Sequence, residues 1–113
     1  MAHQATHGFG LWAVELRETG EVIGAAGLGH LEDGPEVEVG YRFLKRQWGN
    51  GYATEAARAS IEFGLDELGL NEIVAVTLST NLASRRVMEK CGLAFVGVVD
   101  VYGNPHVKYA TDR

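Results

Sequence analysis

Residues 43–55 read FLKRQWGNGYATE, and this stretch decides how the rest of the chain is interpreted. An alternating apolar segment ends near Phe43, a polar loop carries Gly49 and Gly51, and a helical pattern begins near Ala53. The first turn of a helix leaves backbone N–H groups unpaired, and the helix dipole places partial positive charge there. Because glycine lets such a backbone approach a bulky anion, the stretch predicts either a pyrophosphate cradle or a tight turn into a helix.

Two better-known phosphate loops do not fit the same residues. No Gly-Lys-Ser/Thr follows the glycines, so the loop is not of the Walker type, and the third glycine of a dinucleotide fingerprint is missing. Thr54 is a candidate cap for the following helix, whose apolar residues recur at helical spacing as far as Gly69.

Three strands are predicted before this loop. Residues 11–17 alternate between apolar and polar side chains, residues 22–31 form a glycine-rich strand after a turn, and residues 36–44 alternate strictly. Gly40 lies in the middle of the third strand and predicts a bulge or a close backbone approach there.

The second half of the chain predicts a further helix and more strands. Asn81 or Thr80 can cap a helix that runs to about Lys90, and residues 103–105 (Gly-Asn-Pro) predict a turn. The strands are expected at residues 73–78, 93–102 and 106–111.

The resulting order is β-β-β-α-β-α-β-β. This order predicts an α+β fold, with a mixed, mostly antiparallel sheet and helices packed on it. Residues 1–10 are expected to be a flexible leader, and residues 11–113 a single domain. Nothing obvious covers one face of the first three strands.

Composition narrows the classes of function. The chain has 113 residues, 46% of them hydrophobic, and a net charge of −5, which argues against nucleic-acid and anionic-membrane binding. A local basic patch remains open at Arg42, Lys45 and Arg46. No apolar stretch approaches the roughly 20 residues that span a bilayer. A single cysteine, Cys91, suits a reducing compartment, and we expect a cytoplasmic protein.

The segments EVEVGYRF, WGNGYATEA and LSTNLASRRVMEKCGLAFVG together resemble the GCN5-related N-acetyltransferase (GNAT) superfamily, and within it the ribosomal-protein alanine acetyltransferase-like (RimJ/RimL-type) branch. The family signature Arg/Gln-x-x-Gly-x-Gly/Ala is matched by residues 48–53, where Trp48 replaces Arg or Gln. A second signature begins at Asn81, and Leu93 stands in it where phenylalanine is usual. The resemblance covers about residues 10–113.

This resemblance also brings out a difference. Family members begin with a strand and two helices that supply much of the acceptor pocket, whereas only about ten residues precede Leu11. The resemblance therefore implies a GNAT-like acyl-CoA acyltransferase fold that is N-terminally truncated. A homodimer that covers the exposed sheet is one arrangement consistent with it.

The resemblance implies that acetyl-CoA is the co-substrate and an amine the acceptor. Backbone groups of the third strand would pair with the pantetheine arm, and loop amides would hold the pyrophosphate. The implied acetyl-CoA-binding residues are Phe43, Lys45, Trp48, Gly49, Asn50, Gly51, Tyr52, Ala53, Thr54, Asn81 and Ser84.

Direct transfer to an amine needs a base for the amine proton and a proton for the departing sulfur. Glu38 is the candidate base, against the alternative of a solvated strand carboxylate like Glu36. Many relatives place a tyrosine on the second helix as the acid, but Met88 stands there. Ser84 is the substitute candidate, against the alternatives of a helix-surface residue or a simple cofactor contact.

Other reactive side chains are assigned no chemistry. Cys91 has no base supplied beside it in the sequence and is expected to pack, and His30 and His106 lack metal-ligand spacing, so no metal is expected. Tyr41 and Phe43 are expected in the core.

Two functions stay open at this point. One is an N-acetyltransferase acting on a protein N-terminus, an amino acid, a polyamine or an antibiotic amine. The other is a truncated, non-catalytic domain that binds acyl-CoA or assembles with a partner.

Overall fold

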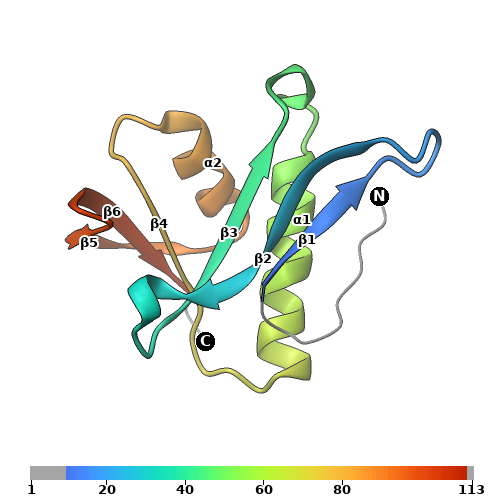
Figure 1. The fold of residues 1–113 in the computed structure, drawn as a ribbon. Coiled ribbons are helices and arrows are strands. Elements are labelled where there is room, and N and C mark those ends of the chain that lie inside the picture. Colours follow the sequence, from blue (N-terminus) through green and yellow to red (C-terminus); the bar gives the residue numbers. More distant parts are fainter. Residues whose placement is uncertain (1–9, 112–113) are drawn as a thin grey trace.

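The computed structural model describes residues 10–111, which form one six-stranded sheet with two α-helices (Figure 1). The main elements are β1 (Gly10–Glu15), β2 (Val22–His30), β3 (Val37–Phe43), α1 (Tyr52–Glu62), β4 (Val74–Thr77), α2 (Leu82–Lys90), β5 (Ala94–Val101) and β6 (Asn104–Ala110). Short helical turns occur at Leu31–Asp33, Lys45–Gln47 and Phe63–Glu67, the last directly extending α1. The predicted order of strands and helices is confirmed.

The strands lie in the order β1-β2-β3-β4-β6-β5. Every neighbouring pair is antiparallel except β3 and β4, which α1 connects as a parallel crossover. The sheet is therefore mixed and mostly antiparallel, as predicted. No helix in the described part of the chain is both long enough and apolar enough to cross a membrane.

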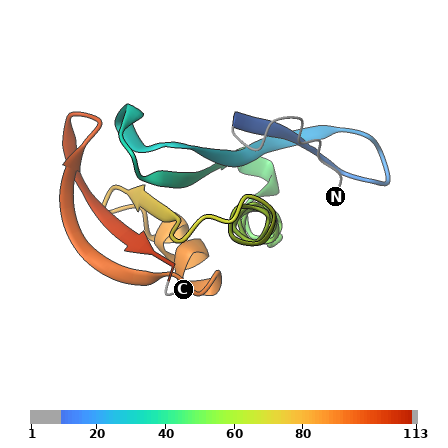
Figure 2. The same cartoon turned by 90° about the horizontal axis from the view of Figure 1, so that it is seen from below.

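The core lies between the sheet and α1. Alternation along β3 buries Val37 and Val39, and these meet Ala57 and Ile61 of α1. Figure 2 shows α1 end-on beneath β1, β2 and β3. Within residues 10–111 no helix covers the opposite face of these three strands, and Leu11 on that face is 52% exposed.

The strand prediction for Gly40 is wrong in detail. The β2–β3 ladder runs without interruption, and Gly40 lies opposite Gly27 in it. Close backbone approaches occur on β2 instead: an added Cβ would lie 1.9 Å from the Gly10 carbonyl oxygen at Gly27, and 2.4 Å from the Arg42 carbonyl oxygen at Gly24. The register shifts fall at Val14/Glu15 of β1 and between Phe95 and Gly97 of β5, so there is no bulge at Gly40.

The start of α1 also differs from the prediction. The helix begins at Tyr52, and Gly51 occupies the N-cap with a left-handed backbone (φ 80°). Thr54 lies inside the first turn and is not the cap. Because Gly51 adopts the left-handed conformation directly before Tyr52, the helix starts two residues before Thr54.

The final hairpin turns earlier than expected. Tyr102 and Gly103 both have positive φ, 52° and 78°, as a two-residue type I′ turn requires. Asn104 and Pro105 consequently belong to β6, where they pair with Val101 and Asp100. Gly-Asn-Pro is a typical turn sequence, but the turn is formed by Tyr102 and Gly103, because a type I′ turn matches the twist of the two strands.

Candidate active site

The candidate site opens where β3 and β4 separate. The two parallel strands are paired at Glu38 and Val74 only, and beyond that point they diverge (Figure 1). A cleft of about 420 Å³ lies in this region. Its walls come from the end of β3, the loop before α1, the first turn of α1, Asn81 and α2.

The glycine loop forms one wall of the cleft. Gly49 and Gly51 both have positive φ, 87° and 80°, and a Cβ added to either would meet no atom within 4 Å. Among the described residues no side chain caps the start of α1, and the first helical bond runs from the Glu55 N–H to the Gly51 carbonyl. The preceding amides and the positive end of the helix dipole therefore face a space that an anion can enter.

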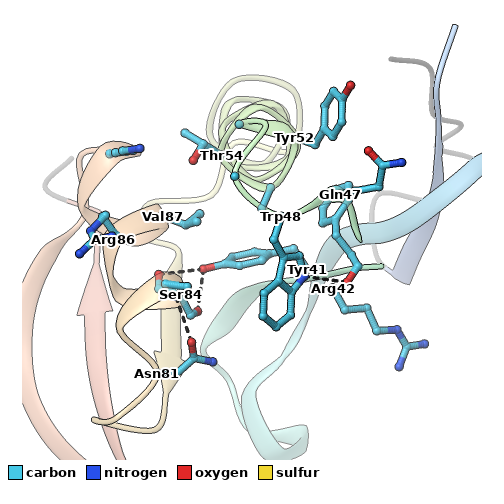
Figure 3. Close-up of a pocket in the computed structure, with 16 residues that line it drawn as sticks. Tyr41, Arg42, Gln47, Trp48, Tyr52, Thr54, Asn81, Ser84, Arg86 and Val87 are labelled. Carbon is cyan, nitrogen blue, oxygen red and sulfur yellow. Dashed lines mark hydrogen bonds between the residues drawn. The ribbon is translucent and has the colours of Figure 1, made fainter. Parts of the chain in front are cut away.

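Trp48 fixes this loop to the strand that precedes it. Its indole Nε1–H donates to the Phe43 carbonyl over 3.0 Å (Figure 3). The Leu44 N–H bonds to Ile23 of β2, and consecutive strand residues direct their backbone groups to opposite edges. The backbone of Phe43 therefore faces the split between β3 and β4, and its carbonyl keeps a second lone pair.

The first turn of α2 forms the facing wall. Asn81 caps this helix, because its Oδ1 accepts the Ser84 N–H at 3.1 Å, which confirms one of the two caps predicted. The Tyr41 hydroxyl crosses from β3 to the same turn and lies 2.9 Å from Ser84 Oγ and 3.2 Å from the Ser84 carbonyl oxygen (Figure 3). Burial raises the pKa of the Tyr41 phenol, and the Ser84 hydrogen bond opposes this in part.

Positive charge gathers at the cleft although the chain is acidic overall. Arg42, Arg86 and Lys90 line it. The sequence suggested a basic patch of Arg42, Lys45 and Arg46, but only Arg42 lines the cleft. Arg46 forms an ion pair with Glu21 instead. Arg86 and Lys90 were not predicted as part of the site. They are four residues apart on a predicted helix, a spacing that places both side chains on one face.

Most of the residues assigned to acetyl-CoA come together at this cleft. Those that line it are Phe43, Trp48, Gly49, Gly51, Tyr52, Ala53, Thr54, Asn81 and Ser84. Lys45 and Asn50 do not line it, and the Asn50 side-chain amide donates to the Gln47 carbonyl instead. Gln47, Arg42 and Tyr41 line the cleft without having been assigned a ligand role.

Glu38 lies away from these residues, on the opposite face of β3. The Tyr102 hydroxyl donates to its carboxylate. Burial raises the pKa of the Glu38 carboxyl, while the bond from Tyr102 and the charge of His106 act in the other direction. Its role as a base stays a prediction.

Two further side chains have structural surroundings. Met88 is 2% exposed and packs in the core, so it does not enter the cleft in place of a tyrosine. The Cys91 thiol lies 3.6 Å from the Thr54 carbonyl, and burial raises its pKa. A thiol held in its protonated form is a poor nucleophile, in line with the packing role expected for Cys91.

Comparison with known proteins identifies the fold. Residues 1–94 match the family described as the acetyltransferase (GNAT) domain. The uncharacterized protein YkkB of Bacillus subtilis is 37% identical over 105 residues, which are 91% of this chain and 61% of that protein.

Solved structures agree with this match. An acetyltransferase from Agrobacterium tumefaciens superposes with a TM-score of 0.84 at 30% identity, over 94% of this chain and 62% of that one. Mycobacterium smegmatis RimJ, in complex with CoA-disulfide, gives a TM-score of 0.73 at 27% identity, over 88% and 51% of the two chains. The chain thus spans less than two thirds of the length of these proteins. It belongs to the GNAT acetyltransferase domain family.

Proposed function

We propose that this protein binds acetyl-CoA in the cleft between β3 and β4 and transfers the acetyl group directly to an amine. The observation that carries the proposal is the meeting of two features in one cleft. The uncapped start of α1 offers amides to a diphosphate, and the open edge of β3 offers backbone groups to a pantetheine arm. Arg86 and Lys90 add positive charge beside both.

The shape of the cleft suits a long, bent ligand with one anionic part. Pantetheine can add to β3 like an extra strand, because the β3 edge beyond Glu38 is not paired with β4. This leaves the thioester near Phe43 and the first turn of α2, where Ser84 lies. A backbone donor aimed at the thioester oxygen at this point would contribute about 2.7–4 kcal/mol to the transition state.

We assign the proton transfers to residues on the two sides of β3. Glu38 takes the proton of the attacking amine, through water, and Ser84 supplies a proton to the departing sulfur. Direct transfer is favoured over an acyl-enzyme, because partial burial raises the pKa of the half-buried Cys91 thiol and keeps it protonated. The acceptor class proposed is the amine of a protein N-terminus or of a small molecule.

We also place the chain in the RimJ/RimL-type branch. RimJ of Mycobacterium smegmatis is among its structural neighbours, and Ser84 follows the cap residue Asn81 by three positions, as in the second signature of the branch.

We further propose a cytoplasmic location and a homodimer in which a second copy covers the open face of β1–β3. Light scattering would measure the mass in solution, and the mass of a monomer would contradict the homodimer.

The test is a titration of acetyl-CoA by calorimetry, followed by a thiol-release assay across four amine classes. The panel contains a peptide with a free N-terminus, an amino acid, a polyamine and an aminoglycoside. Binding together with thiol release for at least one class supports the proposal. Binding without release for any of them favours the alternative, a non-catalytic acyl-CoA-binding domain, and absence of binding contradicts both.

A further inference from the structure

Tyr41 connects two elements that otherwise diverge at the cleft. Its ring is half-buried and packs against both core clusters beneath the sheet, one around Val39 and one around Val14. Only its hydroxyl reaches across to α2, where it meets the Oγ and the carbonyl oxygen of Ser84 at 2.9 and 3.2 Å. The core thus holds the phenol in a fixed place with respect to the serine.

We infer that Tyr41 is the positioning residue of the leaving-group step: its hydroxyl holds Ser84 Oγ so that the serine proton is directed at the sulfur of the departing CoA. This inference rests on the proposed function, because it assigns a role within that reaction. It explains how the cleft can deliver a proton although Met88, at the helix position where a tyrosine was considered, is buried in the core.

The protons of the two hydroxyls allow this assignment. The phenol and the serine hydroxyl carry one proton each, and the Ser84 N–H is already taken by the Asn81 cap. The Tyr41 proton has two acceptors on Ser84, the carbonyl oxygen at 3.2 Å and Oγ at 2.9 Å, and Oγ is the nearer of the two. When Tyr41 donates to Oγ, the serine proton is free to point into the cleft. The raised pKa of Tyr41 keeps the phenol protonated at neutral pH, so it can act as this donor.

The acidity of the two hydroxyls points the same way. A serine that loses its proton alone would become an alkoxide, which is a far stronger base than a thiolate. With the phenol behind it, Ser84 can take the Tyr41 proton as it gives up its own, and the negative charge comes to rest on the phenolate. The ordinary pKa of tyrosine is about 10, far below that of an aliphatic alcohol. Burial raises the pKa of Tyr41 and the Ser84 hydrogen bond opposes this increase, so the charge is less costly on the phenol than on the serine.

The whole step then balances. The neutral amine attacks the thioester carbon, the C–S bond breaks, and its electron pair leaves on sulfur. The sulfur receives the Ser84 proton, Ser84 receives the Tyr41 proton, and the phenolate is reprotonated by water. The extra proton on the new amide nitrogen passes through water to Glu38, which releases it to solvent. The products are the acetamide and free CoA thiol.

Tyr41→Phe tests this inference, since it removes the hydroxyl and keeps the ring. The expected result is a fall in kcat of about tenfold or more, with the acetyl-CoA Kd unchanged within about twofold. Ser84→Ala should show the same pattern. The double variant should lose no more than Ser84→Ala alone, because the two hydroxyls act in series.

Tyr109→Phe is the matched control. The Tyr109 hydroxyl also ties a strand to α2, through Arg85 Nε at 3.2 Å and Glu89 Oε2 at 3.1 Å, but it does not line the cleft. This variant should lower the melting temperature while keeping the wild-type kcat. If Tyr41 had only a structural role, Tyr41→Phe would likewise lower the melting temperature and keep the wild-type kcat. A comparison of kcat in the two variants therefore distinguishes a structural role from a role in proton delivery.

Three outcomes would overturn the inference. These are a wild-type kcat in Tyr41→Phe, a loss of acetyl-CoA affinity in that variant without loss of kcat, or additive losses in the double variant. If the wild-type protein binds acetyl-CoA but acetylates no amine, the proposed function fails first and the inference falls with it. The titration and thiol-release assay of the wild type show this before any variant is made.

Discussion

Glu38 and Tyr41 lie on opposite faces of the same strand, β3. The amine that attacks a thioester and the thiolate that leaves it are on different sides of the reacting carbon. Two polar groups on the two faces of one strand therefore suit the two proton transfers of the proposed reaction. Burial raises the pKa of Glu38, which brings a carboxylate closer to the pH at which a general base works well.

Glu38→Gln should lower turnover by about 100-fold or more and leave the acetyl-CoA Kd unchanged, because only the base is removed. The wild-type rate should fall as the pH drops through the raised pKa of Glu38, since the protonated carboxyl cannot accept a proton. The variant should lack this acidic limb. Thiol release measured from acidic to neutral pH checks both statements.

Glu36→Gln is the control for this experiment. Glu36 lies directly before β3 and accepts from Lys108 Nζ at 2.6 Å, so it is already engaged in an ion pair. Turnover within about twofold of wild type is expected for it. Equal rates for the wild type and Glu38→Gln would remove Glu38 from the mechanism.

The residue scale also shows where sequence reasoning stops. Alternation along β3 correctly placed Tyr41 on the core side, and its ring does pack there. Its hydroxyl, however, finds a partner 43 residues further along the chain. A pattern that extends over a few residues carries no information about such a contact, so Tyr41 was not recognised as part of the site.

At the scale of single elements, α2 depends on Asn81. The side chain that the resemblance assigns to acetyl-CoA is also the cap of the helix that carries Ser84, and its Oδ1 is occupied by the Ser84 N–H. Capping side chains contribute about 1 kcal/mol to stability. Asn81 thus fixes the position of Ser84 whether or not it touches a ligand.

Asn81→Ala should lower the free energy of unfolding by about 1 kcal/mol, whereas Asn81→Ser should retain most of it because serine is an equally good cap. Urea denaturation of the two variants measures the difference. A further comparison is their affinity for acetyl-CoA. If both variants unfold at the same urea concentration as the wild type, the capping role is wrong.

Element boundaries were predictable to the extent that they depend on local signals. Asn81 was predicted as one of two possible caps for α2, and Gly92 ends that helix with a φ of 83°. The start of α1 and the last hairpin were each displaced, because Gly51 and the pair Tyr102–Gly103 adopt positive φ that the surrounding chain path requires. A short stretch of sequence does not show where the tertiary structure requires a positive φ.

At the scale of the whole molecule, α1 and the turn that extends it pack closely against the sheet. Gly64, in the turn that extends α1, allows the closest approach. A Cβ added there would lie 2.6 Å from Ile73 Cδ1 and 2.9 Å from Leu28 Cδ1. Both of these side chains are fully buried, so they have little freedom to move away.

Gly64→Ala should therefore destabilise the protein by about 1–3 kcal/mol through overpacking, although alanine favours helices. Gly29→Ala is the control, because a Cβ at that strand position meets no atom within 4 Å. Chemical denaturation compares the two. Equal stability of Gly64→Ala and the wild type would show that α1 can shift outward without cost.

The fold as a whole could be predicted, because each helix and strand has its own hydrophobic period and is bounded by turn residues. The cleft could be predicted only in part. Its loop carries its own glycine signal, but its width arises where β3 and β4 pair at one position and then part. That divergence belongs to the tertiary structure and has no counterpart in local sequence.

The central claim is that the amides before α1 bind the diphosphate of CoA, and a calorimetric titration of Gly51→Glu with acetyl-CoA tests it most directly. The control is Gly69→Glu, since Gly69 also has positive φ (69°) and open space around it but lies outside the cleft. Both variants place a glutamate at a position with positive φ, so each adds backbone strain and the same charge. We predict that Gly51→Glu no longer binds acetyl-CoA while Gly69→Glu binds it as the wild type does; wild-type affinity in Gly51→Glu would contradict the claim.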